Sequence, residues 1–434
     1  MTTPDPFAVM RSRGYVALLI LAAVVGVPVS ALAYGFLKLV DVLQNWVFVD
    51  VPDAIGDPMW WPVVPLTVAG VLVAATIRYL PGKGGHSPAD GFKAGAAPPT
   101  AAELPGVAIA ATATLALGVV LGPEAPLIAL GGGAAFLIVR LAKPNAPERV
   151  GNVVGASGSF AAISTLLGSP LLGAFLLMEA TGLAGAMLEV VLLPGLLAAG
   201  VGSLVFLGLD SWTGWGTFAL SIPDLPDFDR PNLAEFGWAL VIGVAGAFAS
   251  VAIHRLALFL RPRVEPRMLL LMPVIGLLTA GLAIGYEQLT DHEATDVLFS
   301  GQSGLGPLVT GASGYTVGAL LLLMVCKGLA YGAALSSFRG GPVFPALYLG
   351  GAGGIALSHL PGLPLVAGVA MGVGAMSAGM LKLPMTSVLL ATLLLASDGV
   401  AVMPLVIVAV VVSYVITVRL TPSPDTVPEE PAPH

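Results

Sequence analysis

Charged residues are scarce in this sequence. Only 10% of its 434 residues are Asp, Glu, Lys or Arg, whereas soluble domains carry about 25%. Hydrophobic residues make up 56% of the chain. This balance excludes an ordinary soluble domain and predicts a protein that crosses the lipid bilayer many times.

Several other features are missing. The single cysteine, Cys326, excludes a disulfide framework and a cysteine-rich metal site. The sequence has no HExxH zinc signature and no nucleotide-binding loop. A net charge of −7 gives no sign of nucleic-acid binding. We therefore expect no metal and no nucleic-acid partner.

Long hydrophobic segments fill most of the chain. A spanning helix needs about 20 apolar residues. Segments 170–182 and 384–397 are too short to cross alone, which predicts tilted or half-crossing helices. The expected fold class is all-α and polytopic, with segments at 14–40, 62–80, 103–121, 126–142, 150–168, 170–182, 184–208, 236–260, 267–288, 315–333, 343–357, 363–380, 384–397 and 401–418.

The sequence repeats itself. The pattern GPxxPxxxLGG that begins at Gly122 recurs 219 residues later, at Gly341. Segment 21–30 resembles 241–250, and 169–177 resembles 383–391, at separations of 220 and 214 residues. Three ordered matches at nearly one spacing indicate two homologous halves. The alternative is chance similarity among the common residues Gly, Pro, Ala and Leu.

Positive charge orients these halves, because Lys and Arg favour cytoplasmic loops. Arg11 and Arg13 precede the first segment, which is therefore expected to run outward. Its counterpart follows residues 150–229, which lack Lys and Arg, and ends among four arginines between 255 and 267. It is expected to run inward, so the repeats are inverted, as in many transporters. The predicted divisions are a cytoplasmic segment, a first repeat, an external linker, a second repeat and a disordered tail, at 1–13, 14–208, 209–235, 236–420 and 421–434.

Prolines and glycines interrupt the apolar sequence at three places. Proline suits the first turn of a helix, so GPEAPLIAL from Gly122 and GPVFPALYL from Gly341 each predict a helix that begins within the membrane. GKGGHSPADG (82–91) predicts a third start, with Ser87 as its cap. The free N–H groups of such starts attract anions. Three converging starts would bind a small anion without a buried Lys or Arg.

Glu124 is the only charged residue between Glu103 and Arg140. An ionised Glu at bilayer depth costs at least ~2.5 kcal/mol. At a helix start its carboxylate can imitate the anion, and once neutral it can leave the place to the ion. Protonation could thus be coupled to anion entry. The alternative is a helix-capping Glu with a structural role only.

These motifs, in this order and in duplicated, inverted halves, resemble the CLC family of chloride channels and chloride/proton antiporters. The resemblance covers about residues 14–418. Family members bind chloride with backbone amides at these three places and use the glutamate of the second as a gate. The resemblance implies that Glu124 is the gating residue and that each subunit of a homodimer has its own pore, with no cofactor. The implied anion path is lined by Gly84, Gly85, His86 and Ser87, by Gly122, Pro123 and Ala125, and by Gly341, Pro342, Val343 and Phe344.

The sequence also departs from the family pattern. Gly85 stands where the family has an ion-contacting serine, although His86 and Ser87 follow directly. Pro123 replaces a basic residue and Ala125 a glycine. His86 could act as a pH-sensitive group at the inner mouth or merely bridge backbone groups. Lys327 and Arg339 could draw anions inward, and snorkelling to the interface would explain them equally.

Two further departures concern proton coupling and the inner gate. Family antiporters carry a proton-transfer glutamate at the end of the helix that contains 169–181. Direct alignment puts Ala180 there, and Glu179 would take that role only if the register shifts by one residue. The family's C-terminal ion-contacting tyrosine is absent, because no tyrosine follows Tyr414.

We therefore expect a transporter rather than an enzyme. It would carry small anions, chiefly chloride, by a channel-like or loosely proton-coupled route that a protonatable glutamate gates. Its partners would be the anion, protons, the bilayer of the cell's inner or plasma membrane and a second copy of the chain. Fluoride selectivity and strict anion/proton antiport are the nearest alternatives.

An intramembrane protease is the alternative from another class. GASG at 155–158 fits the serine motif of rhomboid-type proteases, with Ser157 paired to His254 or His359. Small residues also let membrane helices pack closely, which favours a packing role for this stretch.

Overall fold

The computed structural model is built from helices. It describes residues 7, 10–91, 97–145, 147–182, 186–220, 222, 228, 230–395 and 399–421. The first half comprises α2 (Arg13–Asn45), α3 (Val51–Ile55), α4 (Val63–Tyr79), α5 (Leu104–Ala116), α6 (Glu124–Ala142), α7 (Glu148–Ala162), α8 (Pro170–Thr181) and α9 (Ala186–Thr213). The second comprises α10 (Leu233–Val264), α11 (Met268–Leu289), α12 (Leu305–Thr310), α13 (Val317–Ser337), α14 (Val343–Ser358), α15 (Leu365–Leu381), α16 (Pro384–Leu394) and α17 (Gly399–Leu420).

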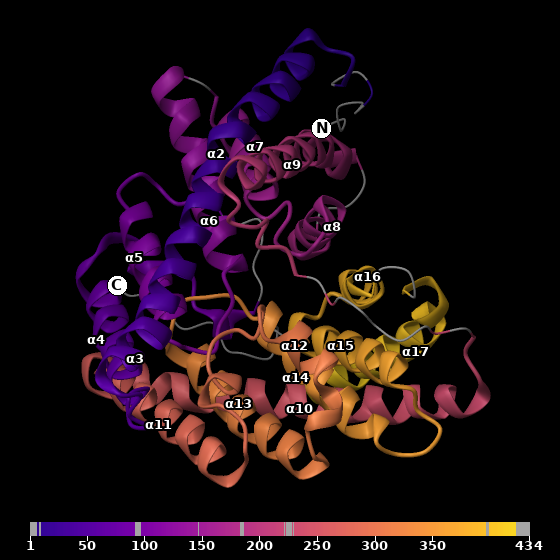
Figure 1. The fold of residues 1–434 in the computed structure, drawn as a ribbon. Coiled ribbons are helices and arrows are strands. Elements are labelled where there is room, and N and C mark those ends of the chain that lie inside the picture. Colours follow the sequence, from indigo (N-terminus) through magenta and orange to yellow (C-terminus); the bar gives the residue numbers. More distant parts are fainter. Residues whose placement is uncertain are drawn as a thin grey trace.

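The two halves pack in the same way. In the first half α2 contacts α7 and α9, and α6 contacts α7; in the second, α10 contacts α15 and α17, and α14 contacts α15. Figure 1 shows most of the first half, indigo to magenta, above the second half, pink to yellow, with α4 of the first half beside α11 of the second. The duplicated, inverted architecture expected from the sequence is confirmed.

The helices suit a bilayer. Six helical stretches of the described chain are long and apolar enough to cross it, and α8 and α16 are among the shorter apolar helices. Large apolar side chains face outward, including Leu204 at 70% and Leu278 at 62% exposure, as expected for a surface in contact with lipid. The protein is a multi-pass membrane protein.

Helix ends lie within about six residues of the expected ends, and the largest difference is at α7, which ends at Ala162 rather than at 168. Helix α6 begins at Glu124, two residues before the expected segment, and the short helix α12 was not expected. Helix α9 continues to Thr213 and α10 begins at Leu233, so both ends of the expected linker are helical. The expected tail beyond 421 lies outside the described residues.

Glycines let the helices next to the motifs approach closely. A Cβ built on Gly158 of α7 would lie 2.4 Å from the carbonyl oxygen of Gly131 in α6. In the second half, a Cβ on Gly350 of α14 would lie 2.3 Å from the carbonyl oxygen of Gly372 in α15. Small residues at crossings are typical of membrane helices. The GASG stretch therefore serves packing.

Lys327 of α13 is fully buried. Its three N–H donors are shared among the carbonyl oxygens of the four consecutive residues from Asp296 to Phe299, which lie 3.0, 3.2, 2.8 and 3.2 Å from Nζ. It also lies 4.4 Å from the ring centre of Tyr348. Of the two alternatives for Lys327, snorkelling to the interface is wrong, because the side chain is buried and these carbonyls supply the polar partners that lipid lacks. The Lys327 ammonium group thus stabilises the backbone of residues 296–299, which precede α12.

Replacing Lys327 by Met is expected to destabilise the protein by about 2–3 kcal/mol, because buried carbonyls would lose their donor. The measurement is the thermal unfolding midpoint of the purified protein in detergent. The exposed Lys143 provides the matched control, and Lys143→Met should leave the midpoint unchanged. Equal midpoints for wild type and Lys327→Met would show that these hydrogen bonds do not support the fold.

Candidate anion site

The two copies of the repeated motif touch each other. The Gly122 N–H donates to the carbonyl oxygen of Gly341 at 2.8 Å, and the Gly341 N–H donates to that of Gly122 at 2.6 Å. This pair forms an isolated antiparallel bridge between the loops that precede α6 and α14. The starts of the two helices are therefore held next to each other.

Glu124 lies at this junction. It is the first residue of α6, and its side chain is fully buried. Its Oε1 accepts a hydrogen bond from the backbone N–H of Val343, the first residue of α14. Its Oε2 has no hydrogen-bond partner among the described groups. A carboxylate thus occupies the positive end of α14, the place where a small anion would be stabilised.

Glycines create the space for this carboxylate. A Cβ on Gly341 would lie 2.0 Å from Cδ of Glu124, and a Cβ on Gly122 would lie 2.1 Å from its Oε2. Real Cβ atoms do not approach so closely. A Cβ on Gly122 would also lie 2.9 Å from Cδ2 of Phe344, which packs on the same side. Any side chain at Gly122 or Gly341 would collide with the carboxylate.

Cavities approach Glu124 from two directions. Leu121 and Pro123 line a cavity of about 200 Å³, which α2 flanks with Asp41 and Gln44. Ala125 and Pro126 line a second cavity of about 320 Å³. Glu124 lies between these pairs in the sequence and lines neither cavity. We call them the outer and the inner cavity, following the orientation expected from the positive charges.

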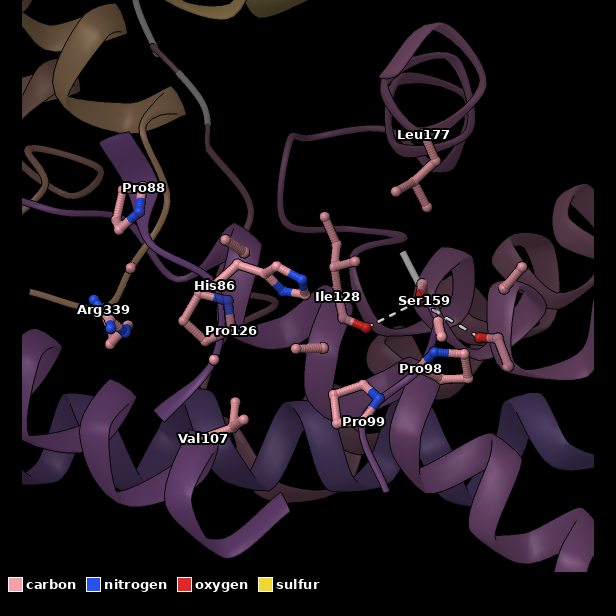
Figure 2. A pocket seen from close by; sticks show the side chains of 18 of the residues that line it. His86, Pro88, Pro98, Pro99, Val107, Pro126, Ile128, Ser159, Leu177 and Arg339 are labelled. Atoms are coloured by element: carbon pink, nitrogen blue, oxygen red, sulfur yellow. Dashed lines mark hydrogen bonds between the residues drawn. The ribbon is translucent and has the colours of Figure 1, made fainter. Parts of the chain in front are cut away.

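All three expected anion-binding stretches contribute to the lining of the inner cavity, the second through Ala125. Gly84, Gly85, His86 and Ser87 line it together with Gly340 and Pro342. Figure 2 shows His86 of the first stretch beside Pro126 of the second. The expectation of a third helix start is wrong. Ser87 makes no capping hydrogen bond, and only a three-residue turn, Pro88–Asp90, follows before Gly91 turns away with φ at 81°. The first stretch therefore meets the site as an irregular loop.

Tyr331 belongs to the site although its sequence context gave no sign of this. It is fully buried in α13, and its hydroxyl donates to the Pro342 carbonyl at 2.6 Å. This bond fixes the residue before Val343. An apolar helix with one tyrosine is too common a pattern to reveal such a contact, which joins residues that only the fold brings together.

Glu179 lies near the end of α8, and its carboxylate contacts the start of a different helix, α16. Its Oε1 accepts from the Met385 N–H at 3.0 Å, and its Oε2 accepts from the Thr386 N–H at 2.8 Å and the Thr386 hydroxyl at 2.6 Å. These donors belong to the first turn of α16. Its neighbours Leu177 and Thr181 line the inner cavity, whereas Glu179 does not.

The protease alternative finds no support. The Ser157 hydroxyl is buried and donates to the Val153 carbonyl of its own helix at 2.9 Å. His359 lies 3.0 Å from the Ile355 carbonyl, also within its own helix end. No hydrogen bond in the described part of the chain joins Ser157 to His254 or His359, so the arrangement lacks a serine–histidine dyad.

Comparisons with known proteins agree with this architecture. The family model described as "Voltage gated chloride channel" matches residues 78–418. YfeO of Escherichia coli O7:K1, a protein named for ion transport, is 28% identical over 364 residues, which cover 82% of each chain. YfeO of Shigella boydii serotype 4 matches with the same identity and coverage.

Two solved structures share the fold. One is a slow cyanobacterial Cl⁻/H⁺ antiporter, with a TM-score of 0.72 and 20% identity over 93% of this chain and 94% of that one. The other is a CLC-type fluoride/proton antiporter, with a TM-score of 0.70 and 20% identity over 93% and 95%. At this identity they demonstrate the fold alone.

Proposed function

The chain belongs to the voltage-gated chloride channel family of anion transporters and channels, and from that premise we propose that Glu124 gates its anion path. Chloride is the main anion that we propose for this path, which would run through the inner and outer cavities. The proposed anion contacts are the motif residues expected from the sequence: Gly84, Gly85, His86, Ser87, Gly122, Pro123, Ala125, Gly341, Pro342, Val343 and Phe344.

One observation supports this proposal above all. The Glu124 carboxylate accepts the Val343 N–H at the start of α14, and the residues on its two sides line different cavities. A carboxylate and a small anion compete for one backbone donor. Protonation removes the negative charge of the carboxylate and weakens its hold on the N–H. The anion then takes the donor, and the path is continuous from one cavity to the other.

Proline shapes how strongly the anion is held. Pro123 and Pro342 precede Glu124 and Val343 at equivalent places of the two repeats, and neither has an N–H. Each helix start therefore offers one donor fewer than another residue would give. A weaker hold favours release, which transport requires as much as binding.

The test is ion flux from proteoliposomes that contain the purified protein and chloride, with external chloride and pH recorded together. Chloride efflux without proton movement is the expected result for a channel-like path. Weak proton movement, fewer than one proton for several chlorides, is expected for loose coupling. No chloride or fluoride flux above that of protein-free vesicles would contradict the proposal.

Strict antiport is the second candidate. It is favoured by the likeness in fold to a chloride/proton and a fluoride/proton antiporter. Against it stands the position of Glu179, whose carboxylate is held by three donors at the start of α16. A group held in this way is a helix cap, worth about 1 kcal/mol.

Glu179→Gln is therefore expected to lower the thermal unfolding midpoint slightly and to leave the proton-to-anion ratio unchanged. The ratio is measured in the same flux assay, with a fluoride electrode for fluoride. Loss of proton movement with anion flux retained would contradict the capping role and support strict antiport through Glu179.

The remaining proposals follow the family. We place the protein in the cell's inner or plasma membrane as a homodimer with one path in each subunit. The proposed divisions of the chain are those expected from the sequence, with repeats over 14–208 and 236–420.

A further inference from the structure

One cation lines the inner cavity without a carboxylate partner. Arg339 lies in the short connection between α13 and α14, four residues before Val343, and its side chain lines the cavity (Figure 2). The ion pairs of the described residues do not include it. Nearby Arg261, by contrast, is paired with Asp90 and lies 3.9 Å from Glu265.

Carbonyl groups occupy only part of the Arg339 guanidinium. Nε donates to the Lys83 carbonyl at 3.1 Å, and Nη1 donates to those of Ser337 and Phe338 at 3.1 and 3.3 Å. Nη2 has no hydrogen-bond partner among the described residues. Neutral carbonyls satisfy donors without cancelling the positive charge. The carboxylates of Asp90 and Glu265 act on Arg339 only from beyond ion-pair distance, and Asp90 is already paired with Arg261. The remaining positive charge attracts an anion from the cavity.

The same side chain supports the cavity wall. Lys83 has φ at 49°, in the left-handed region that side chains disfavour, and Gly82, Gly84 and Gly85 beside it also have positive φ. The Arg339 Nε bond to the Lys83 carbonyl holds this turn. A Cβ on Gly84 would lie 3.5 Å from Cγ of Arg339, so the stem of the side chain packs against the turn.

We propose that Arg339 is a determinant of anion entry from the inner side: its unpaired charge concentrates monovalent anions in the inner cavity, directly before the Glu124 gate. This rests on the proposed function of that gate. Pro123, by contrast, brings no positive charge to the outer cavity that it lines. The positive charge therefore lies on the inner side of the Glu124 gate, and an anion that enters from that side meets it before it reaches Glu124.

Two substitutions separate charge from support. Arg339→Gln removes the charge, whereas Arg339→Lys keeps it but cannot reproduce the planar contacts with three carbonyls. If Arg339 acts only through its hydrogen bonds to the cavity wall, both variants lose chloride flux equally. If its positive charge matters, only Arg339→Gln loses chloride flux. Arg78→Gln is the control, because Arg78 is exposed and does not line the inner cavity.

The experiment measures chloride flux from proteoliposomes at low chloride, where the rate rises linearly with concentration, and at saturating chloride. An impermeant salt sets the ionic strength. We expect Arg339→Gln to reduce the low-chloride slope about fivefold at 10 mM ionic strength and less than twofold at 1 M, since the Debye length falls from ~30 to ~3 Å. The saturated rate should stay unchanged, and Arg339→Lys and Arg78→Gln should remain within about twofold of wild type.

An equal slope for wild type and Arg339→Gln at low ionic strength would overturn the inference, as would equal losses in Arg339→Gln and Arg339→Lys. If Arg339→Gln does not fold, Arg339→Lys decides: a wild-type slope supports the charge, and a lost slope contradicts it. Failure of the wild type to transport would instead refute the proposed function itself.

Discussion

Replacing Glu124 by Gln is expected to leave an anion flux that no longer changes with pH. In the wild type the flux should rise as the pH falls, because protonation releases the carboxylate from the Val343 N–H. One titrating group can change the rate by at most about tenfold per pH unit. Glutamine carries no charge and does not titrate, so its flux should match that of the wild type at acidic pH across the whole range.

The measurement is initial chloride efflux from proteoliposomes between pH 4.5 and pH 8, in steps of about half a unit. Asp41→Asn serves as the control, because Asp41 lines the outer cavity but has no place at the helix starts. That variant should keep the wild-type profile. A pH-dependent flux in Glu124→Gln would remove Glu124 from the gating mechanism.

The second large effect is expected from Gly341→Ala. The added Cβ would lie within 2.1 Å of Cδ and Oε1 of Glu124, in the place that the carboxylate or an anion fills. Gly341 does not have a positive φ, so alanine fits the backbone and the collision is the main consequence. Overpacking costs about 1–3 kcal/mol. If that cost falls on anion binding, the flux should fall about 5- to 150-fold.

The control for this variant is Gly318→Ala. A Cβ on Gly318 meets only the Thr316 hydroxyl oxygen, at 4.0 Å, so alanine there should preserve the flux. Both variants should elute as wild type in size-exclusion chromatography. Wild-type flux from Gly341→Ala would show that neither the carboxylate nor the anion uses the space beside Gly341.

Much of the fold could be predicted from hydrophobicity and repetition. Membrane helices are set by length and apolar composition, which is why segments such as 62–80 and 267–288 agree with α4 and α11 to within about two residues. The repeat at Gly122 and Gly341 also predicted that two helices begin inside the membrane. Helix α12 escaped notice because a six-residue helix has no hydrophobic period to read.

The site could be predicted only in part. The sequence placed Glu124 at a helix start, but the donor that it meets, Val343, lies 219 residues away, and only the packing of the halves brings the two together. Ser87-Pro88 reads as a cap and first turn, yet the positive φ of Gly91 ends the turn at once. The hydrogen bonds of Lys327 could not be predicted either, because the carbonyls that it binds belong to a loop with no sequence motif.

The backbone N–H at the start of α14 is proposed to hold either the Glu124 carboxylate or an anion, and gating depends on this exchange. The most direct test is a crystal structure of Glu124→Gln grown in bromide, with anomalous diffraction measured at the bromine edge. The account predicts an anomalous peak within hydrogen-bonding distance of the Val343 nitrogen. Bromide peaks elsewhere along the path, with none at Val343, would contradict it.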